Sequence, residues 1–294
     1  MPDPQPGVIH DIGYRHYTGP RLGRAATVRA LYVQSFRGAY GLGRSAKSKI
    51  MPILILVIMC LPALVIAAVV NGLGLKTQPV RYTRYAMLLL AVVSIFVAAQ
   101  SPQMVSRDLR FRLTSLYFSR PLSRLDYVAA KYAAMVCALL VLLVSPLVIL
   151  YGGGLLARLP AGAETRHFLI GVAGAVLFAL VLAGIGLLIA AFTPRRGFGV
   201  AAVIAVLLVT YSAVSVVQGI ALEQGQASVA GYAGLFSPFT LVDGVQVWLL
   251  HAQPSTPVAP PGTLGGVTFL AATVVVVAVS VALLLLRYRK VSIS

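Results

Sequence analysis

The charged side chains whose spacing suggests a common task lie in one segment of the chain, Ser106–Lys131. Asp108, Arg110 and Arg112 stand beside an apolar stripe at helical spacing. The stripe consists of Leu109, Leu113, Leu116 and Tyr117. Such a stripe with charges off it is typical of a short amphipathic helix, and Pro121 ends the helix because proline cannot donate a backbone hydrogen bond. The pattern therefore predicts a helix that lies across one face of the protein.

The end of this segment carries a start signal for the next helix. Ser123 offers a side-chain oxygen as an N-cap, and Asp126 follows three residues later, as in a weak variant of the capping box. We therefore expect a rigid helix clamped directly to the apolar segments on either side of it. A rigid lever of this kind can pass a push from a soluble partner into those segments.

Motifs for catalysis or cofactor binding are absent or incomplete in the sequence. Gly38–Ser45 nearly matches the phosphate-binding loop G-x-x-x-x-G-K-[ST], but Arg44 stands where the lysine belongs. No HExxH, GxSxG or paired Cys/His cluster occurs, and the two cysteines lie in apolar segments without CxxC spacing. Only seven residues are acidic, which leaves little to build a general acid–base pair. We expect neither an enzyme nor a metal or cofactor site.

Six uncharged apolar segments of about 20 to 25 residues make up nearly half of the chain. They are Ile50–Val70, Tyr85–Val105, Tyr132–Tyr151, Phe168–Phe192, Val200–Leu222 and Gly265–Leu286. A helix of about 20 apolar residues crosses the hydrocarbon core of a bilayer. In lipid, the backbone must satisfy its hydrogen bonds within each segment. The sequence therefore predicts an all-α integral membrane protein with six transmembrane helices.

The positive charge is distributed unevenly around these six spans. Of the 24 Lys and Arg, eight precede the first span, six lie between spans two and three, two lie between spans four and five, and three follow the last. The remaining five lie in the opposite loops. By the positive-inside rule both termini are cytoplasmic. The net charge of +17 would suit anionic lipid headgroups and, given this distribution, does not indicate a nucleic-acid partner.

Residues 1–49 are expected to form a cytoplasmic arm and an interfacial helix, and residues 50–294 the six-span domain. From Ala25 onward an apolar stripe recurs at helical spacing, with arginines off it. The stripe consists of Val28, Leu31, Tyr32, Phe36 and Tyr40. Such a helix suits the headgroup plane; the alternative is a short soluble helix packed on another subunit.

One apolar stretch between the last two spans, Leu235–Leu250, is too short to cross a bilayer. Its length predicts short re-entrant or interfacial helices. Trp248 would then lie at headgroup level, where tryptophan is enriched.

The segment Ser106–Lys131 also resembles the first cytoplasmic loop of type-two ATP-binding-cassette (ABC) transporter permeases. The resemblance depends on an acidic residue, an apolar helix and then Leu116, Arg120-Pro121, Ser123-Arg124, Tyr127 and Lys131. It extends over most of the chain, through the basic surface helix, the six spans and the long outer segment before the last span. Many members have Glu followed by a Gly-Thr pair, whereas the stretch from Asp108 to Thr114 lacks that glycine.

This resemblance implies a loop that rests in a groove of a separate ATPase subunit, with two permease subunits facing each other around the substrate path. It also implies residues that contact the ATPase or hold the coupling helix between spans two and three. These residues are Asp108, Arg110, Leu113, Leu116, Arg120 and Arg124. The alternative role for the arginines is positive-inside anchoring alone.

A substrate path would need polar side chains inside the spans. Tyr211, Ser215 and Gln218 share one helical face of the fifth span and are our candidates for the lining. The alternative is helix–helix packing, in which such side chains form hydrogen bonds across the interface. No span contains an ionisable residue, which disfavours a proton- or sodium-coupled carrier.

The sequence thus predicts the permease subunit of an ATP-driven ABC exporter in a bacterial-type cytoplasmic membrane. Its expected partners are two cytoplasmic ABC ATPase subunits, a second permease subunit, identical or related, and anionic lipids. ATP hydrolysis would belong to the partner, so this chain needs no cofactor. The alternative is a non-transporting membrane scaffold or assembly subunit.

Overall fold

The computed structural model describes residues 19, 22–106, 108, 122–193 and 195–291. Within these ranges the chain is all-helical and contains no strand. Most of the amphipathic helix predicted after Ser106 lies outside the described residues. So do four of the candidate coupling residues, namely Arg110, Leu113, Leu116 and Arg120.

Among the described residues, five helices are long and apolar enough to cross a membrane. They are α2 (Ala46–Gly72), α7 (Arg124–Leu156), α8 (Ala161–Phe192), the helix Arg196–Glu223 and α13 (Gly262–Val291). The helix Arg196–Glu223 consists of α9 (Arg196–Ile204), a π-helical stretch (Ala205–Val209) and α10 (Thr210–Glu223). These helices cover five of the six apolar segments and are compatible with a multi-pass membrane protein.

The remaining apolar segment, Tyr85–Val105, is not one straight helix. It contains most of α3 (Tyr82–Leu88) and all of α4 (Leu90–Met104), which are bent by 67° at Leu89. If this pair is one broken span, the described part of the chain has up to six helices that could cross a membrane. The expectation of a continuous helix is wrong here, and no proline or glycine at the break reveals the bend in the sequence.

Two buried tyrosine hydroxyls fix the direction of α3. Tyr82 donates a hydrogen bond to the carboxylate of Glu164 in α8, at 2.6 Å. Tyr85 donates to the backbone carbonyl of Met59 in α2, also at 2.6 Å. Because α3 is tied to two different helices, it leaves the line of α4.

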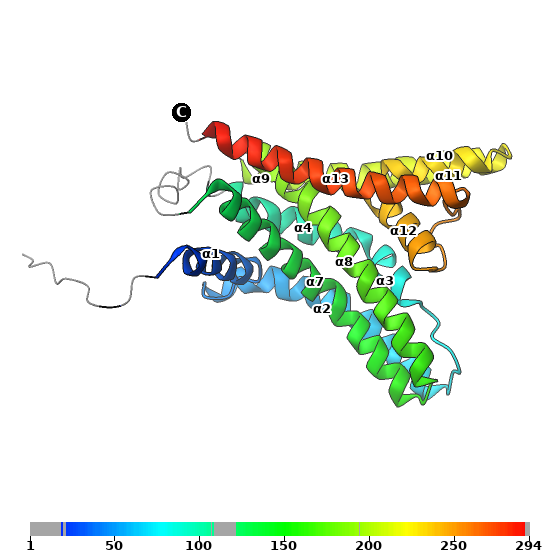
Figure 1. Cartoon of the computed structure of the whole chain (residues 1–294). Coiled ribbons are helices and arrows are strands. Elements are labelled where there is room, and N and C mark those ends of the chain that lie inside the picture. The colour runs from blue at the N-terminus through cyan, green and yellow to red at the C-terminus, as the bar shows by residue number, and fades with distance from the viewer. Residues whose placement is uncertain (1–18, 20–21, 107, 109–121, 194, 292–294) are drawn as a thin grey trace, which may run out of the picture.

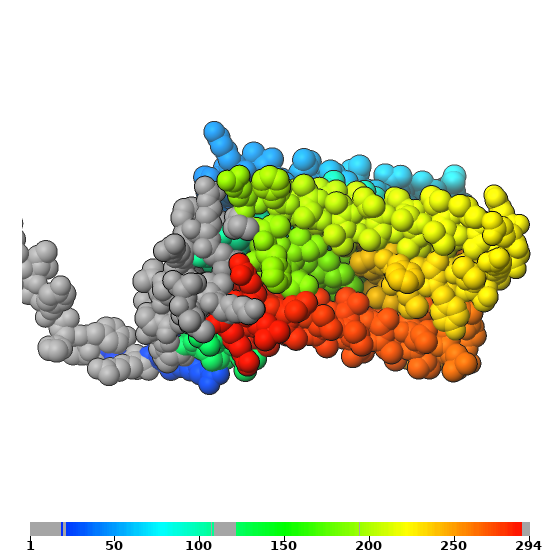
Figure 2. Space-filling model, turned by 90° about the horizontal axis from the view of Figure 1, so that it is seen from above, coloured from blue at the N-terminus to red at the C-terminus, as the bar shows by residue number. Residues whose placement is uncertain are grey.

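The helices α7 and α8 form the centre of the molecule and cross it diagonally in Figure 1. In an apolar stretch of 18 residues, 56% of α7 and 61% of α8 is buried. The corresponding shares for the other three long helices lie between 17% and 22%. Figure 2 shows α13 and the helix Arg196–Glu223 running along one face. Exposed apolar side chains on these two helices include Val216, Val217, Ile220, Val274, Val275 and Val279. Lipid tails or another apolar protein surface would cover such a face.

The N-terminal helix α1 (Arg24–Ala39) confirms the helical spacing predicted from Ala25 onward. Its apolar stripe packs on α7 and α4 of the same chain. Leu31 is buried, and the Tyr40 hydroxyl donates to the Ala138 carbonyl at 2.7 Å. The stripe is therefore covered by its own chain, and the position of α1 in the headgroup plane stays a prediction.

The chain between α10 and α13 forms α11 (Ala227–Ala233), a 3-10 turn (Gly234–Phe236) and α12 (Pro238–Leu249). This confirms short helices in place of a span; whether they are re-entrant or interfacial stays a prediction. The helix α12 packs on α8 and α13. Trp248 lies directly against Gly266 of α13.

One carboxylate is buried in α12. Asp243 is 2% exposed, and its Oδ2 accepts hydrogen bonds from the Ser255 backbone N–H (3.0 Å) and the Thr256 hydroxyl (3.4 Å). Burial raises the pKa of Asp243 above its ordinary value of 3.8, and the hydrogen bonds from Ser255 and Thr256 offset part of that rise.

Adjacent glycines of α7 provide a test of the close packing between α7 and α2. A Cβ on Gly153 would overlap the side chain of Ala67, whereas a Cβ on Gly152 would meet nothing within 4 Å. We expect Gly153→Ala to cost about 1–3 kcal/mol because the two helices must separate. Gly152→Ala is the matched control and should keep or raise stability, since Ala favours a helix over Gly by about 1 kcal/mol. Thermal unfolding in detergent measures both; equal midpoints would contradict the close contact.

The raised pKa of Asp243 predicts a pH-dependent stability. The folded state binds the Asp243 proton more tightly than the unfolded state, so this residue's contribution to the free energy of unfolding falls as pH rises from 3.8 through the folded-state pKa. Asp243→Asn keeps an oxygen acceptor for the Ser255 N–H and removes the charge. We expect the unfolding temperature of this variant, relative to the native protein, to increase between pH 3.5 and pH 7.

The control for Asp243 is Glu223→Gln, which removes an exposed carboxylate from the end of α10. Its difference from the native protein gives the effect of removing a carboxylate that is exposed to water in the folded chain. A pH profile of Asp243→Asn parallel to that of the native protein would exclude a cost of burying this charge.

Candidate functional site

A buried ionic cluster lies where α4 ends and α7 begins. The Nζ of Lys131 is 2.8 Å from the Oδ2 of Asp108, and the Tyr127 hydroxyl donates to the same oxygen at 2.7 Å. Lys131 also donates to the Met104 carbonyl at 2.9 Å. The Lys131 and Asp108 side chains are only 9% and 11% exposed. We call Asp108, Tyr127, Lys131 and Tyr288 the junction cluster.

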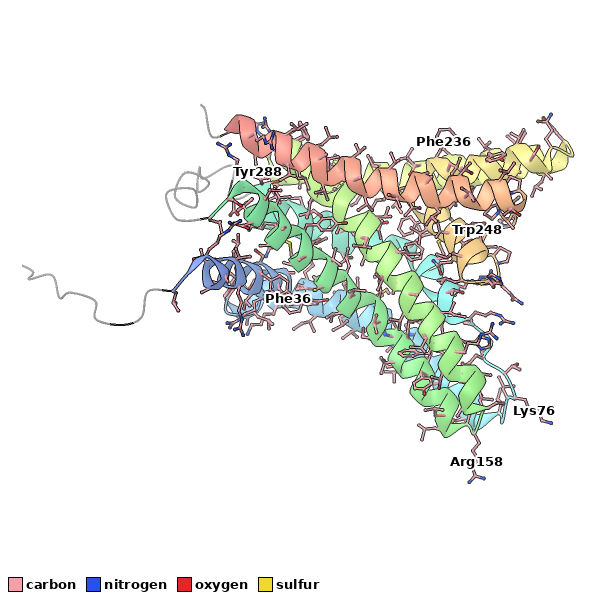
Figure 3. All side chains as sticks on the ribbon, viewed as in Figure 1. Phe36, Lys76, Arg158, Phe236, Trp248 and Tyr288 are labelled. Carbon is pink, nitrogen blue, oxygen red and sulfur yellow. The ribbon has the colours of Figure 1, made fainter. Side chains whose placement is uncertain are left out.

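The junction cluster connects the start of the segment 106–123 to α7 and α13, and Ser106 connects it to α8. Tyr127 and Lys131 belong to α7, and the ring of Tyr288 in α13 lies 4.9 Å from that of Tyr127. Figure 3 shows Tyr288 near the C-terminal end of α13, beside the start of α7. The Ser106 hydroxyl donates to the Ala190 carbonyl of α8 at 2.8 Å. The backbone entering the segment is thus held from three sides.

The far end of the same segment is held by the capping box predicted at Ser123 and Asp126. The Asp126 N–H donates to the Ser123 hydroxyl (3.2 Å), and the Ser123 N–H donates to the Asp126 carboxylate (3.0 Å), which confirms the cap of α7. Arg24 of α1 then donates to both carboxylate oxygens of Asp126, at 2.7 and 2.8 Å. The start of α7 is therefore tied to α1.

Only two of the candidate coupling residues can be placed. Asp108 is buried and holds the start of the segment to α7, so its carboxylate faces the inside of the bundle. Arg124 begins α7 and, with Leu122 and Arg289, lines a shallow hollow of about 430 Å³. The four other candidates lie outside the described residues.

The three candidates for the substrate path lie in α10 and have different surroundings. The Gln218 side chain is 3% exposed and donates to the Ala230 carbonyl of α11 at 3.1 Å. Ser215 is exposed and donates back to the Tyr211 carbonyl at 2.9 Å. The Tyr211 ring packs edge-on against Phe239 of α12. Gln218 and Tyr211 thus contribute to packing, and a path along this face stays a prediction.

Two partners in these contacts were not singled out from the sequence. Tyr288 follows the last apolar segment and carries no local signal for its contact with Tyr127. Arg24 is one of eight basic residues before the first span, and nothing in the sequence pairs it with Asp126. For Lys131 a signal does exist: it stands four residues after Tyr127, on the same face of α7.

Removing one member of the buried pair is expected to destabilise the protein strongly. Lys131→Met leaves the Asp108 carboxylate buried without its cation, a change that typically costs about 3–5 kcal/mol. The double variant with Asp108→Asn should recover part of this loss, because no unpaired charge remains. Thermal unfolding of the native protein, both single variants and the double variant gives the coupling energy.

The exposed ion pair provides the control for this experiment. Arg24 has a side chain 62% exposed, so Arg24→Gln should lower the unfolding temperature much less than Lys131→Met. If the two substitutions lower the unfolding temperature by comparable amounts, burial does not increase the contribution of the Asp108–Lys131 pair to stability.

No family model and no curated protein matches the chain.

Proposed function

We propose that this chain is the membrane-spanning permease subunit of an ATP-driven ABC exporter. Segment 106–123 would act as the coupling helix that receives a push from a cytoplasmic ATPase. The observation that carries this proposal is that described contacts fix both ends of the segment. Asp108 and Ser106 hold its start, and Ser123 with Asp126 holds its end.

A segment that transmits force must be fixed at both ends, as segment 106–123 is. A force on the segment reaches α7 through Lys131 and through the cap at Ser123, and reaches α8 through Ser106. A flexible tether would instead absorb the same displacement. Closure of the ATPase subunits would therefore rock α4 and α7 relative to their neighbours.

The proposed topology has six spans, with α3 and α4 forming the second. Both termini then lie in the cytoplasm, on the side that holds most of the Lys and Arg. The exposed apolar faces of α2, α10 and α13 suit lipid tails and a second permease subunit. The absence of ionisable residues from the predicted spans supports an energy source on another polypeptide.

The hollow beside Arg124 suits an acidic or polar surface of an ATPase subunit. Arg124 and Arg289 contribute its cationic rim, and Leu122 and Leu285 contribute apolar area. An interface of this composition combines electrostatic steering with burial of apolar surface.

The first test is co-purification of the tagged chain with an ABC ATPase encoded beside it, followed by ATP hydrolysis in lipid nanodiscs. We expect a stable complex whose hydrolysis rate depends on this chain. A chain that is stable alone and binds no ATPase would contradict the permease and favour the membrane scaffold.

The second test reverses charge at the proposed contact. Arg120→Glu with Arg124→Glu should weaken ATPase binding about tenfold or more, equivalent to about 1.4 kcal/mol, or uncouple hydrolysis from transport. Arg195→Glu with Arg196→Glu is the matched control, since it makes the same charge change at the start of α9, where both arginines are exposed. If the two double variants behave alike, a specific contact at the coupling segment is excluded.

A further inference from the structure

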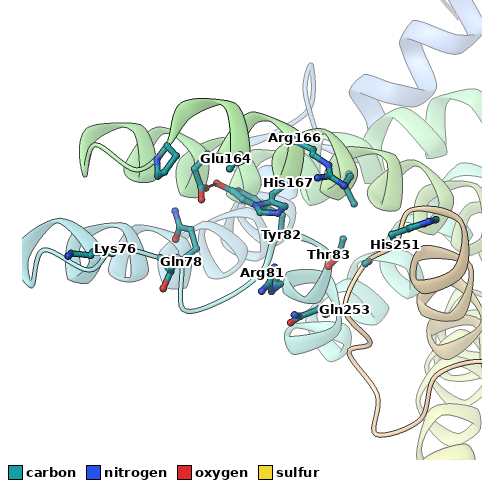
Figure 4. A pocket seen from close by; sticks show the side chains of 15 residues that line it. Lys76, Gln78, Arg81, Tyr82, Thr83, Glu164, Arg166, His167, His251 and Gln253 are labelled. Atoms are coloured by element: carbon teal, nitrogen blue, oxygen red, sulfur yellow. Dashed lines mark hydrogen bonds between the residues drawn. The ribbon is translucent and has the colours of Figure 1, made fainter.

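A cavity of about 370 Å³ lies far from the junction cluster, where the loop before α3 approaches the start of α8 (Figure 4). Figure 3 shows Lys76 and Tyr288 at opposite ends of the molecule. The walls of the cavity come from residues 76–83, residues 160–170 and residues 251–253. Its volume falls within the range of about 300–1,000 Å³ for small-molecule sites.

Basic side chains gather around this cavity. Lys76, Arg81 and Arg166 line it, together with His167 and His251, and Glu164 is the one acidic residue of the lining. In the topology proposed above, this side of the membrane holds only five of the 24 Lys and Arg. Three of those five therefore surround one cavity, although the positive-inside rule disfavours basic residues there.

Within the part of the chain that the structure describes, none of these three cations forms an ion pair, and Glu164 is the only carboxylate of the lining. The ion pairs within that part are Arg24–Asp126 and Lys131–Asp108, both remote from the cavity. Glu164 is buried beside the cavity, and its carboxylate accepts the Tyr82 hydroxyl. A bound anion would offset the repulsion among the three cations. Guanidinium groups bind phosphate especially well because they can donate two parallel hydrogen bonds.

The cavity wall is fixed before any ligand arrives. The Tyr82–Glu164 hydrogen bond joins α3 to α8, and the Gln78 side-chain amide donates to the Leu150 carbonyl of α7 at 3.0 Å. Gly154 leaves room for this arrangement, since a Cβ there would press on the Gln78 amide. A site whose walls are held by hydrogen bonds binds a ligand with less loss of conformational entropy.

Aromatic rings next to the cavity indicate its height in the bilayer. Phe168 packs between Tyr82 and Tyr151, with ring centroids 6.1 and 4.8 Å away. Tyrosine is enriched where headgroups meet the hydrocarbon core. Phosphate groups of lipids are therefore within reach of the cavity, as are soluble phosphates from the aqueous side.

We propose that this cavity is a binding site for a phosphate group, which Arg81 and Arg166 hold from opposite walls. The phosphate is carried either by a lipid headgroup or by a small soluble molecule. This site would bind phosphate on this chain alone, so its test does not require an ATPase partner.

The test measures binding to the purified full chain in a neutral detergent by calorimetry, at one fixed ionic strength. The probes are inorganic phosphate, dihexanoyl phosphatidic acid and the phosphate-free dihexanoylglycerol. Arg81→Gln with Arg166→Gln should weaken binding of the phosphate-bearing probe about tenfold or more. Arg84→Gln with Arg158→Gln removes the same charge from the same side outside the cavity lining, and should change binding less than about twofold.

Three results support the site and distinguish the sources. Binding of phosphatidic acid alone identifies a lipid headgroup, binding of inorganic phosphate alone identifies a soluble ligand, and similar binding of both indicates that the phosphate supplies most of the recognition. Arg81→Gln and Arg166→Gln are also measured singly, with unfolding temperatures, so that a misfolded double variant does not decide the result. Failure of both phosphate probes, equal loss in the two double variants, or equal binding of dihexanoylglycerol would overturn the proposal.

Discussion

One buried ion pair, Asp108–Lys131, is the constraint on which the end of the bundle near α1 depends. Two charges removed from water are tolerated only with close partners, and the Tyr127 hydroxyl and the Met104 carbonyl supply the remaining contacts. These four residues come from the end of α4, the following segment and α7. The need to satisfy one carboxylate and one ammonium group therefore fixes how the chain passes between the two helices.

The two ends of the bundle differ in how charge is satisfied. At the junction cluster the charges are paired and buried, which suits a rigid mechanical connection. At the cavity lined by Arg81 and Arg166, basic groups face open space without an ionic partner among the described residues, which suits ligand binding. The proposed coupling segment and the proposed phosphate site would then lie at opposite ends of the bundle.

Local patterns predicted several features well because the physics behind them is local. Hydropathy over 20 residues identified five long helices, and the spacing of Ser123 and Asp126 identified the cap that begins α7. Helical periodicity alone did not predict the surroundings of the residues proposed to line the substrate path. Tyr211 and Gln218 lie on the predicted face, but contacts with α11 and α12 turn them to packing roles that a single helix cannot reveal.

The sequence by itself determined the apolar helices, their approximate ends and the uneven charge around them, since these depend on desolvation and on hydrogen bonds within a few residues. Only the tertiary structure decided the 67° bend at Leu89, the partner of Asp108 and the cavity between α3 and α8. Each of these depends on side chains far apart in the chain, such as Tyr82 and Glu164. Their pairing produces no periodic pattern in the sequence. It is the packing of α7 and α8 at the centre that brings such residues within hydrogen-bond distance.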